Sequence, residues 1–155
     1  MEKKNVLVTG IGGNVGQGII KNIRAFSDQI KIIGTGISDF SSGNYLCDVT
    51  YKVPYAYEEN YISAIIDIVK KEKVDLIIPS TDYEVYYLAA NKSAIPCTLA
   101  ASEALAAEIY LDKYKTFEYH KKYGIPFANA AEPAAYDGSF KECIVKKKKG
   151  RGSRG

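Results

Sequence analysis

Short apolar runs alternate along the chain with longer segments in which apolar residues recur at helical spacing. The strand-like runs are rich in β-branched residues and cover residues 6–8, 30–36, 51–53, 74–79 and 95–99. Alternation of this kind is typical of βα units built around a parallel sheet. The pattern therefore predicts an α/β fold, a Rossmann-like parallel sheet flanked by helices.

Five helices are predicted between and after these runs. Val15, Ile19 and Ile23 recur at spacing four, and residues 58–72 place Ile62, Ile65, Ile66 and Val69 on one face. Residues 82–91 follow a capping-box sequence, in which the Thr81 hydroxyl and Glu84 are spaced to bond each other's backbone N–H. Two further helices are expected at residues 102–107, capped by Ser102, and at residues 112–123, ended by Gly124.

The chain is expected to divide into two parts near residues 109–115, so we assign residues 1–111 and 112–155 to separate domains. Residues 128–138 are small, polar and contain Pro133, which predicts a loop. After this loop, residues 143–146 read as one more strand, and it runs into a cationic glycine-rich segment, residues 147–155.

Composition is that of an ordinary globular protein. The 155 residues are 46% hydrophobic and 25% charged, and no apolar run approaches the roughly 20 residues of a membrane span. The N-terminus lacks the pattern of a signal peptide, so a cytoplasmic location is expected. Cys47, Cys97 and Cys143 lack metal-ligand spacing and are expected to be buried, reduced thiols.

The positive charge of the chain is local. The formal charge of +3 would be −3 without the six cations of residues 146–154. The body therefore has no basic face of the kind that binds nucleic acid. The oligomeric state is left open by the sequence.

A glycine-rich turn follows the first strand and opens the first helix. Its sequence, Thr-Gly-Ile-Gly-Gly-Asn-Val-Gly at residues 9–16, has the glycine spacing of extended short-chain dehydrogenases. A dinucleotide site would also need an acidic residue or an arginine at the end of the second strand. Neither an acidic residue nor an arginine stands at the end of the second predicted strand, and Asp39 follows only after that end. Close packing of the turn is the favoured interpretation, and an NAD(P)-dependent oxidoreductase remains an alternative.

The C-terminal segment has the parts of a phosphate-binding loop. Glycines allow backbone N–H groups to turn toward an anion, and lysines and arginines add charge. The hydroxyl of Ser153 lies among them. A solvated tail without function is the alternative.

Four motifs in order resemble the N-terminal portion of ATP-grasp proteins of the carbamoyl-phosphate synthase large-subunit type. They are residues 5–13 (Asn-Val-Leu-Val-Thr-Gly-Ile-Gly-Gly), 75–84 (Asp-Leu-Ile-Ile-Pro-Ser-Thr-Asp-Tyr-Glu), 112–126 and 144–155. The resemblance implies a pre-ATP-grasp domain at residues 1–111 and the beginning of an ATP-grasp N-terminal subdomain at residues 112–155. Lys147 departs from the family, which usually has proline at this position.

The resemblance also implies the roles of particular residues. Lys113 and Lys146 would hold ATP, and the loop of Gly150, Arg151, Gly152 and Ser153 would close over its phosphates. The substrate side would be shaped by Gly10, Gly12 and Gly13. Independently of the resemblance, Asp82 and Glu84 are candidates to line the same cleft, because open α/β sheets bind ligands at the carboxyl ends of their strands, and capping is the simpler account of Glu84. In such enzymes a small carboxylate attacks the γ-phosphate of ATP, Mg²⁺ neutralises the charge, and an amine-type nucleophile captures the acyl phosphate.

No metal ligand of that kind is expected within these 155 residues, since the family's acidic and amide ligands come from a later segment. The chain is therefore expected to be an inactive fragment of such a ligase. A third alternative is a domain without catalytic function that binds a small ligand or a partner chain.

Overall fold

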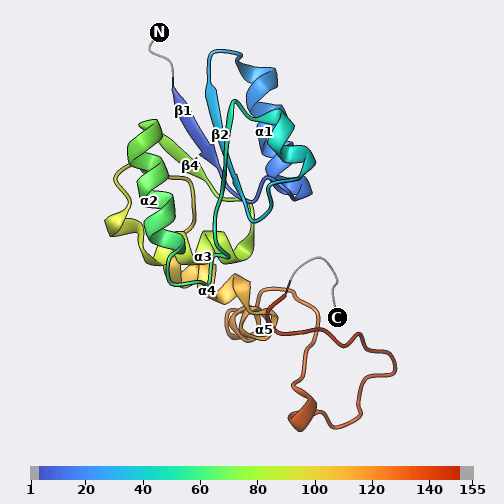
Figure 1. The fold of residues 1–155 in the computed structure, drawn as a ribbon. Helices are drawn as coiled ribbons and strands as arrows, with labels where there is room; N and C mark the ends of the chain where they lie inside the picture. The colour runs from blue at the N-terminus through green and yellow to red at the C-terminus, as the bar shows by residue number, and fades with distance from the viewer. Residues whose placement is uncertain (1–3, 151–155) are drawn as a thin grey trace. The chain divides into compact units, whose positions relative to one another are not determined.

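The structure, a computed structural model, describes residues 4–150 (Figure 1). The chain forms two compact units that divide between Ala104 and Leu105. We call residues 4–104 unit 1 and residues 105–150 unit 2, and describe each by itself.

Unit 1 is built on a five-stranded parallel sheet with the strand order β3-β2-β1-β4-β5. The strands are β1 (Asn5–Val8), β2 (Lys31–Gly36), β3 (Val49–Lys52), β4 (Leu76–Ile78) and β5 (Thr98–Leu99). The central strand β1 pairs in register with both neighbours, Leu7 lying opposite Ile33 on one side and Ile77 on the other. The predicted α/β fold with a parallel sheet is confirmed.

Helices cover both faces of this sheet. The helices of unit 1 are α1 (Asn14–Phe26), α2 (Tyr61–Glu72) and α3 (Asp82–Ala90), with short 3-10 helices η1 (Ser42–Leu46) and η2 (Lys92–Ala94). Figure 1 shows α1 and α2 on opposite sides of the strands. One core packs α1 against Val6, Val8 and Ile32, and a second packs α2 and α3 against Leu7 and Ile33.

Alternation along β1 explains the two cores. Successive side chains of a strand point to opposite faces, so Val6 and Val8 enter one core and Leu7 the other. All three are buried, as are the residues of β2 that lie beside them. Strands that are buried on both faces read as continuous apolar runs, which is the pattern of the sequence.

Unit 2 contains α4 (Ala104–Leu111), which starts at the division, α5 (Lys113–Lys122) and the short η3 (Pro133–Ala135). Asp112 caps α5 by accepting hydrogen bonds from the backbone N–H groups of Tyr114 and Lys115 at 2.9 and 3.1 Å. Gly124 has φ +65°, the left-handed conformation expected just after a helix. The helix predicted at residues 102–107 begins two residues later and extends to Leu111.

The strand predicted at residues 143–146 is wrong. The segment is irregular, and Ile144 and Val145 are 81% and 89% exposed. A β-branched run becomes a strand only when a neighbouring strand pairs with its backbone. No strand forms between residues 105 and 150, so this segment has no such neighbour. In the part of the chain that the structure describes, no helix has the length and apolar character needed to cross a membrane.

Candidate functional site

The carboxyl ends of β1 and β4 place two helix N-termini side by side in unit 1. The two strands are neighbours, and the chain leaves β1 for α1 and β4 for α3. The strand order reverses between them, and open α/β sheets bind ligands at such a point. Most of the predicted substrate-side residues lie in these two connections.

Gly10 is fixed by the connection after β4. Its φ is +62°, and the Ser80 hydroxyl donates a hydrogen bond to its carbonyl at 3.2 Å. A Cβ at Gly10 would lie 2.5 Å from the Ser80 Oγ and 2.7 Å from the Glu84 Oε2. The turn therefore requires glycine for its conformation and for its close approach to the second connection.

The other glycines shape the start of α1. Gly13 is the N-cap and makes no side-chain capping bond, and its N–H donates to the Gly10 carbonyl at 3.0 Å. A Cβ at Gly16 would lie 2.8 Å from the Gly10 carbonyl oxygen, so Gly16 lets the helix pack on the turn. A Cβ at Gly12 would make only ordinary van der Waals contacts, with the side chain of Ser41. The close-packing interpretation of these glycines is confirmed for Gly10 and Gly16.

Asp82 and Glu84 stand in the first turn of α3. The Thr81 hydroxyl accepts from the Glu84 N–H at 3.3 Å, which confirms its predicted capping role, and donates to the Glu84 carboxylate at 2.8 Å. Glu84 is 8% exposed, whereas Asp82 is exposed. Two carboxylates at a helix N-terminus are favoured by the positive end of the helix dipole.

Asp39, which lies beyond the end of β2, forms an exposed ion pair with Lys52 at 2.8 Å. This carboxylate is thus engaged by the end of the neighbouring strand β3. The described residues provide no observation that favours the oxidoreductase alternative.

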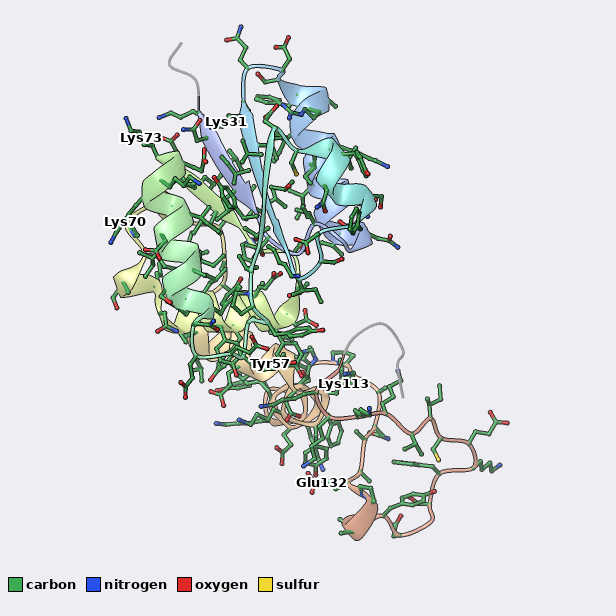
Figure 2. All side chains as sticks on the ribbon, in the orientation of Figure 1. Lys31, Tyr57, Lys70, Lys73, Lys113 and Glu132 are labelled. Atoms are coloured by element: carbon green, nitrogen blue, oxygen red, sulfur yellow. The ribbon has the colours of Figure 1, made fainter. Side chains whose placement is uncertain are left out.

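In unit 2 the structure brings together two of the predicted ATP-binding residues. Lys113 is the first residue of α5, and its Nζ donates to the Gly150 carbonyl at 3.0 Å. Its backbone N–H donates to the Lys148 carbonyl, also at 3.0 Å. Figure 2 labels Lys113 at α5. The N-terminus of α5 is therefore joined to the start of the glycine-rich segment, although 37 residues separate them in sequence.

Lys146 is not joined to this pair. It is exposed, and it makes no hydrogen bond or ion pair with any residue between 4 and 150. Arg151, Gly152 and Ser153 lie outside the described residues. Of the predicted ATP-binding set, the structure therefore joins Lys113 to Gly150, and within residues 4–150 it shows no bond from Lys146 to either of them.

Two residues of these regions were missed by the sequence reasoning. The Ser80 hydroxyl donates a hydrogen bond to the Gly10 carbonyl. The sequence feature that could have indicated this residue is its position directly after the apolar run 74–79. Lys148 pairs with Glu132, whose hydrogen bond raises the pKa of Lys148, and its Nζ lies 5.7 Å from the Tyr114 ring centre. A run of four lysines gave no indication of which one would be paired.

Histidine, cysteine and carboxylate side chains do not gather in groups of three or more anywhere in residues 4–150. Neither described unit thus offers a ready cluster for a divalent cation. The three cysteines are free thiols, as predicted. Their predicted burial is wrong for Cys143, which is exposed in the irregular segment of unit 2, and Cys47 and Cys97 are only partly buried.

Comparison with known proteins identifies the family. Residues 6–98 match the family model described as the PylC-like, N-terminal domain. No curated protein matches the chain. Among solved structures, the chain is similar to an N5-carboxyaminoimidazole ribonucleotide synthetase in complex with ADP, with a TM-score of 0.62 and 15% identity over 83% of this chain and 31% of that one.

Two other solved structures show the same fold. An L-amino acid ligase from Bacillus licheniformis gives a TM-score of 0.61 and 13% identity over 81% of this chain and 32% of that one. The biotin carboxylase domain of Hydrogenobacter thermophilus 2-oxoglutarate carboxylase was solved with MgADP and bicarbonate. It gives a TM-score of 0.58 and 19% identity over 79% of this chain and 28% of that one. This chain spans about a third of the length of the structures that it matches. With its fold and the family model in agreement over unit 1, the chain belongs to the PylC-like N-terminal domain family, a pre-ATP-grasp domain.

Proposed function

We propose that this chain is the N-terminal part of an ATP-dependent carboxylate ligase resembling the carbamoyl-phosphate synthase large subunit. Unit 1 serves the substrate side, and unit 2 supplies the first groups that hold ATP. By itself the chain does not ligate. The family assignment and the nucleotide-bound enzymes that share its fold support this proposal.

The observation that carries the proposal is the bond between Lys113 and Gly150. A lysine ammonium is a compact charge with three donors, suited to phosphate oxygens. Here it lies at the N-terminus of a helix and within hydrogen-bonding distance of a glycine-rich segment. A cationic side chain and the positive end of a helix dipole thus meet beside a glycine backbone, and both favour an anion.

On the substrate side, the connections after β1 and β4 define the surface. Backbone N–H groups at the start of α1 and the carboxylate of Asp82 are available there. Gly10, Gly12 and Gly13 keep this surface free of side chains, and Glu84 borders it from α3.

The residues present fit ATP better than they fit a metal. Lys113, Gly150 and the exposed ammonium of Lys146 would hold phosphate groups. Bound ATP would supply the phosphoryl group that activates a carboxylate, and Mg²⁺ would balance its charge. No cluster of acidic ligands for that ion exists in residues 4–150. We therefore assign Mg²⁺ to the intact enzyme and give it no ligand here.

The test is a titration of the full chain with a fluorescent ATP analogue. Lys113→Ala and Lys146→Ala should each weaken binding by about ten- to 150-fold, because each removes a charge-assisted bond worth roughly 1.5–3 kcal/mol. Lys141→Ala is the matched control, since Lys141 is an exposed lysine of the same segment, and it should bind as the unchanged chain does.

Equal binding by all three variants would contradict the assignment of these lysines. A saturable fluorescence change with NADH, together with no response to the ATP analogue, would favour the oxidoreductase alternative. Catalysis of ligation by the chain alone would contradict the expectation of an inactive fragment.

A further inference from the structure

The start of α5 is covered by a short segment of the same unit, residues 148–150, which we call the strap. The Lys148 carbonyl accepts a hydrogen bond from the backbone N–H of Lys113 at 3.0 Å. The Gly150 carbonyl accepts one from the Lys113 ammonium, also at 3.0 Å. The two groups with which Lys113 could bind an anion, its N–H and its ammonium, are therefore both bonded to the strap.

The other N–H groups in the first turn of α5 are occupied as well. The Asp112 carboxylate accepts from Tyr114 and Lys115, and the Asp112 carbonyl accepts from Thr116 at 2.9 Å. An anion at a helix N-terminus binds to N–H groups that have no partner within the helix. Since the cap holds two of these groups, only the N–H of Lys113 can be released, and the strap must move to release it.

The strap presents carbonyl oxygens to Lys113, whereas a phosphate-binding loop presents N–H groups. A glycine-rich loop binds phosphate by turning its backbone N–H groups toward the phosphate oxygens. Lys148 and Gly150 turn their carbonyl oxygens toward Lys113 instead, and these partial negative charges repel a phosphate group. The strap and a phosphate group therefore compete for the same donors.

The side chain of Lys148 fastens the strap to the rest of unit 2. Its ammonium forms an ion pair with Glu132, and its Nζ lies 5.7 Å from the centre of the Tyr114 ring. The hydrogen bond to Glu132 raises the pKa of Lys148 above the ordinary 10.5, so the ion pair is present at neutral pH. The two side chains are 56% and 36% exposed, and an ion pair exposed to this extent is weak enough to open. Figure 2 labels Glu132 and Lys113.

We propose that the strap is an autoinhibitory contact, in which residues 148–150 occupy the Lys113 end of the nucleotide site until ATP replaces them. The inference rests on the proposed function, because it takes Lys113 as a residue that binds ATP. When Lys148 leaves Glu132, the strap turns over, its carbonyl oxygens move away from Lys113, and its N–H groups become available to phosphate. The apparent affinity for ATP is lowered in proportion to the fraction of molecules in which the strap is open.

The first test is hydrogen exchange of the full chain without nucleotide, followed by NMR. The N–H of the first residue of a helix has no partner within the helix, so protection of the Lys113 N–H reports the strap alone. This N–H should be protected, and in Glu132→Gln it should exchange about 1.5- to five-fold faster, the range expected for loss of an exposed ion pair. Glu142→Gln is the matched control, because it removes the same charge from an exposed position of the same irregular segment, and it should leave the protection unchanged.

The second test is the titration of the same variants with the fluorescent ATP analogue. Glu132→Gln should tighten binding about 1.5- to five-fold, because the strap opens more often. Tyr114→Leu removes the ring beside Lys148 without a change of charge, and it should tighten binding about two- to five-fold. Glu142→Gln should bind the analogue as the unchanged chain does.

An unprotected Lys113 N–H in the unchanged chain would overturn the proposal, because the strap would then be absent in solution. Weaker or unchanged binding in both Glu132→Gln and Tyr114→Leu would overturn it too. Tighter binding in Glu132→Gln alone would trace the effect to the loss of a nearby negative charge and count equally against the strap.

The outcomes separate this inference from the proposed function. If no variant binds the ATP analogue while the Lys113 N–H stays protected, the nucleotide site is wrong and the inhibitory role falls with it. If all variants bind the analogue equally well, the nucleotide site stands and only the inhibitory role is removed.

Discussion

Ser80 and Gly10 are joined by a hydrogen bond of 3.2 Å, from the Ser80 hydroxyl to the Gly10 carbonyl. The two residues are 70 positions apart in sequence, and they connect the turns that follow β1 and β4. The bond therefore fixes the relative position of the two helix starts between which we place the substrate side. It also makes the shape of this surface depend on residue 10 having no side chain.

Gly10→Ala should destabilise unit 1 by about 2–4 kcal/mol. The reason is a left-handed backbone conformation combined with a Cβ placed 2.5 Å from the Ser80 Oγ. Chemical denaturation measures the change in the free energy of unfolding. Gly18→Ala is the matched control, because a Cβ at this position of α1 would meet nothing within 4 Å, and it should stabilise unit 1 by roughly 0.5–1 kcal/mol. Equal effects of the two changes would contradict this account of the turn.

Stability at acid pH should depend on Glu72. This carboxylate accepts hydrogen bonds from Lys31, at 2.7 Å, and from the Tyr51 hydroxyl, and these bonds lower its pKa below the ordinary 4.5. A group with a lowered folded-state pKa stabilises above its unfolded pKa, and this contribution is lost as the pH falls through the folded value. The free energy of unfolding should therefore decrease below about pH 4.5.

Glu72→Gln should flatten that part of the pH profile, measured by urea denaturation between pH 3 and pH 7. Asp67→Asn, an exposed carboxylate change on the same helix, serves as control and should leave the slope as it is. The prediction is wrong if both variants keep the full acid dependence.

The cysteines should differ sharply in reactivity. Burial raises the pKa of Cys47 to about 11, so about one thiol in a thousand is ionised at pH 8, and burial also raises the pKa of Cys97. Cys143 is exposed. Iodoacetamide at pH 8, followed by peptide mass spectrometry, should modify Cys143 first. In denaturant the three should react at similar rates, and early modification of Cys47 in the folded chain would count against its burial.

The cap of α5 should control the local stability of unit 2. Asp112 is 7% exposed and accepts from two backbone N–H groups. Asp112→Ala should cost about 0.5–2 kcal/mol and reduce the hydrogen-exchange protection of α5 by roughly two- to thirty-fold. Asp112→Asn keeps an accepting oxygen and should preserve most of the protection. A similar loss in both variants would show that the charge, rather than the cap, is what matters.

Much of unit 1 was predictable because its elements are stabilised by nearby residues and by one repeating pattern. The apolar runs that became β1 and β2 are buried on both faces, β4 buries Ile77 and leaves Leu76 and Ile78 partly buried, and Thr81 caps α3 as its spacing indicates. Residues 143–146 show the opposite case. They have the composition of a strand, but a strand also needs a partner, and partners are not visible in local sequence.

The candidate sites show the same division. Glycines at positions 10 and 16 indicated a tight turn, the cationic glycine-rich segment indicated a phosphate site, and the family resemblance implied that Lys113 belongs to that site. The contact of Gly10 with Ser80, the bond from Lys113 to Gly150 and the ion pair of Lys148 with Glu132 came only with the structure. Each depends on where strands and turns bring separate segments, which no single window of sequence contains.

The amino-acid sequence by itself determined the class of fold, the cap of α3 at Thr81, and the residue types able to bind phosphate. Those properties arise from local backbone preference and from the periodic burial of apolar side chains. The tertiary structure alone decided which distant groups meet: Ser80 with Gly10, Lys113 with Gly150, and Lys148 with Glu132. Such meetings are set by the order of the strands and the packing of the core, because these bring residues far apart in sequence within contact distance.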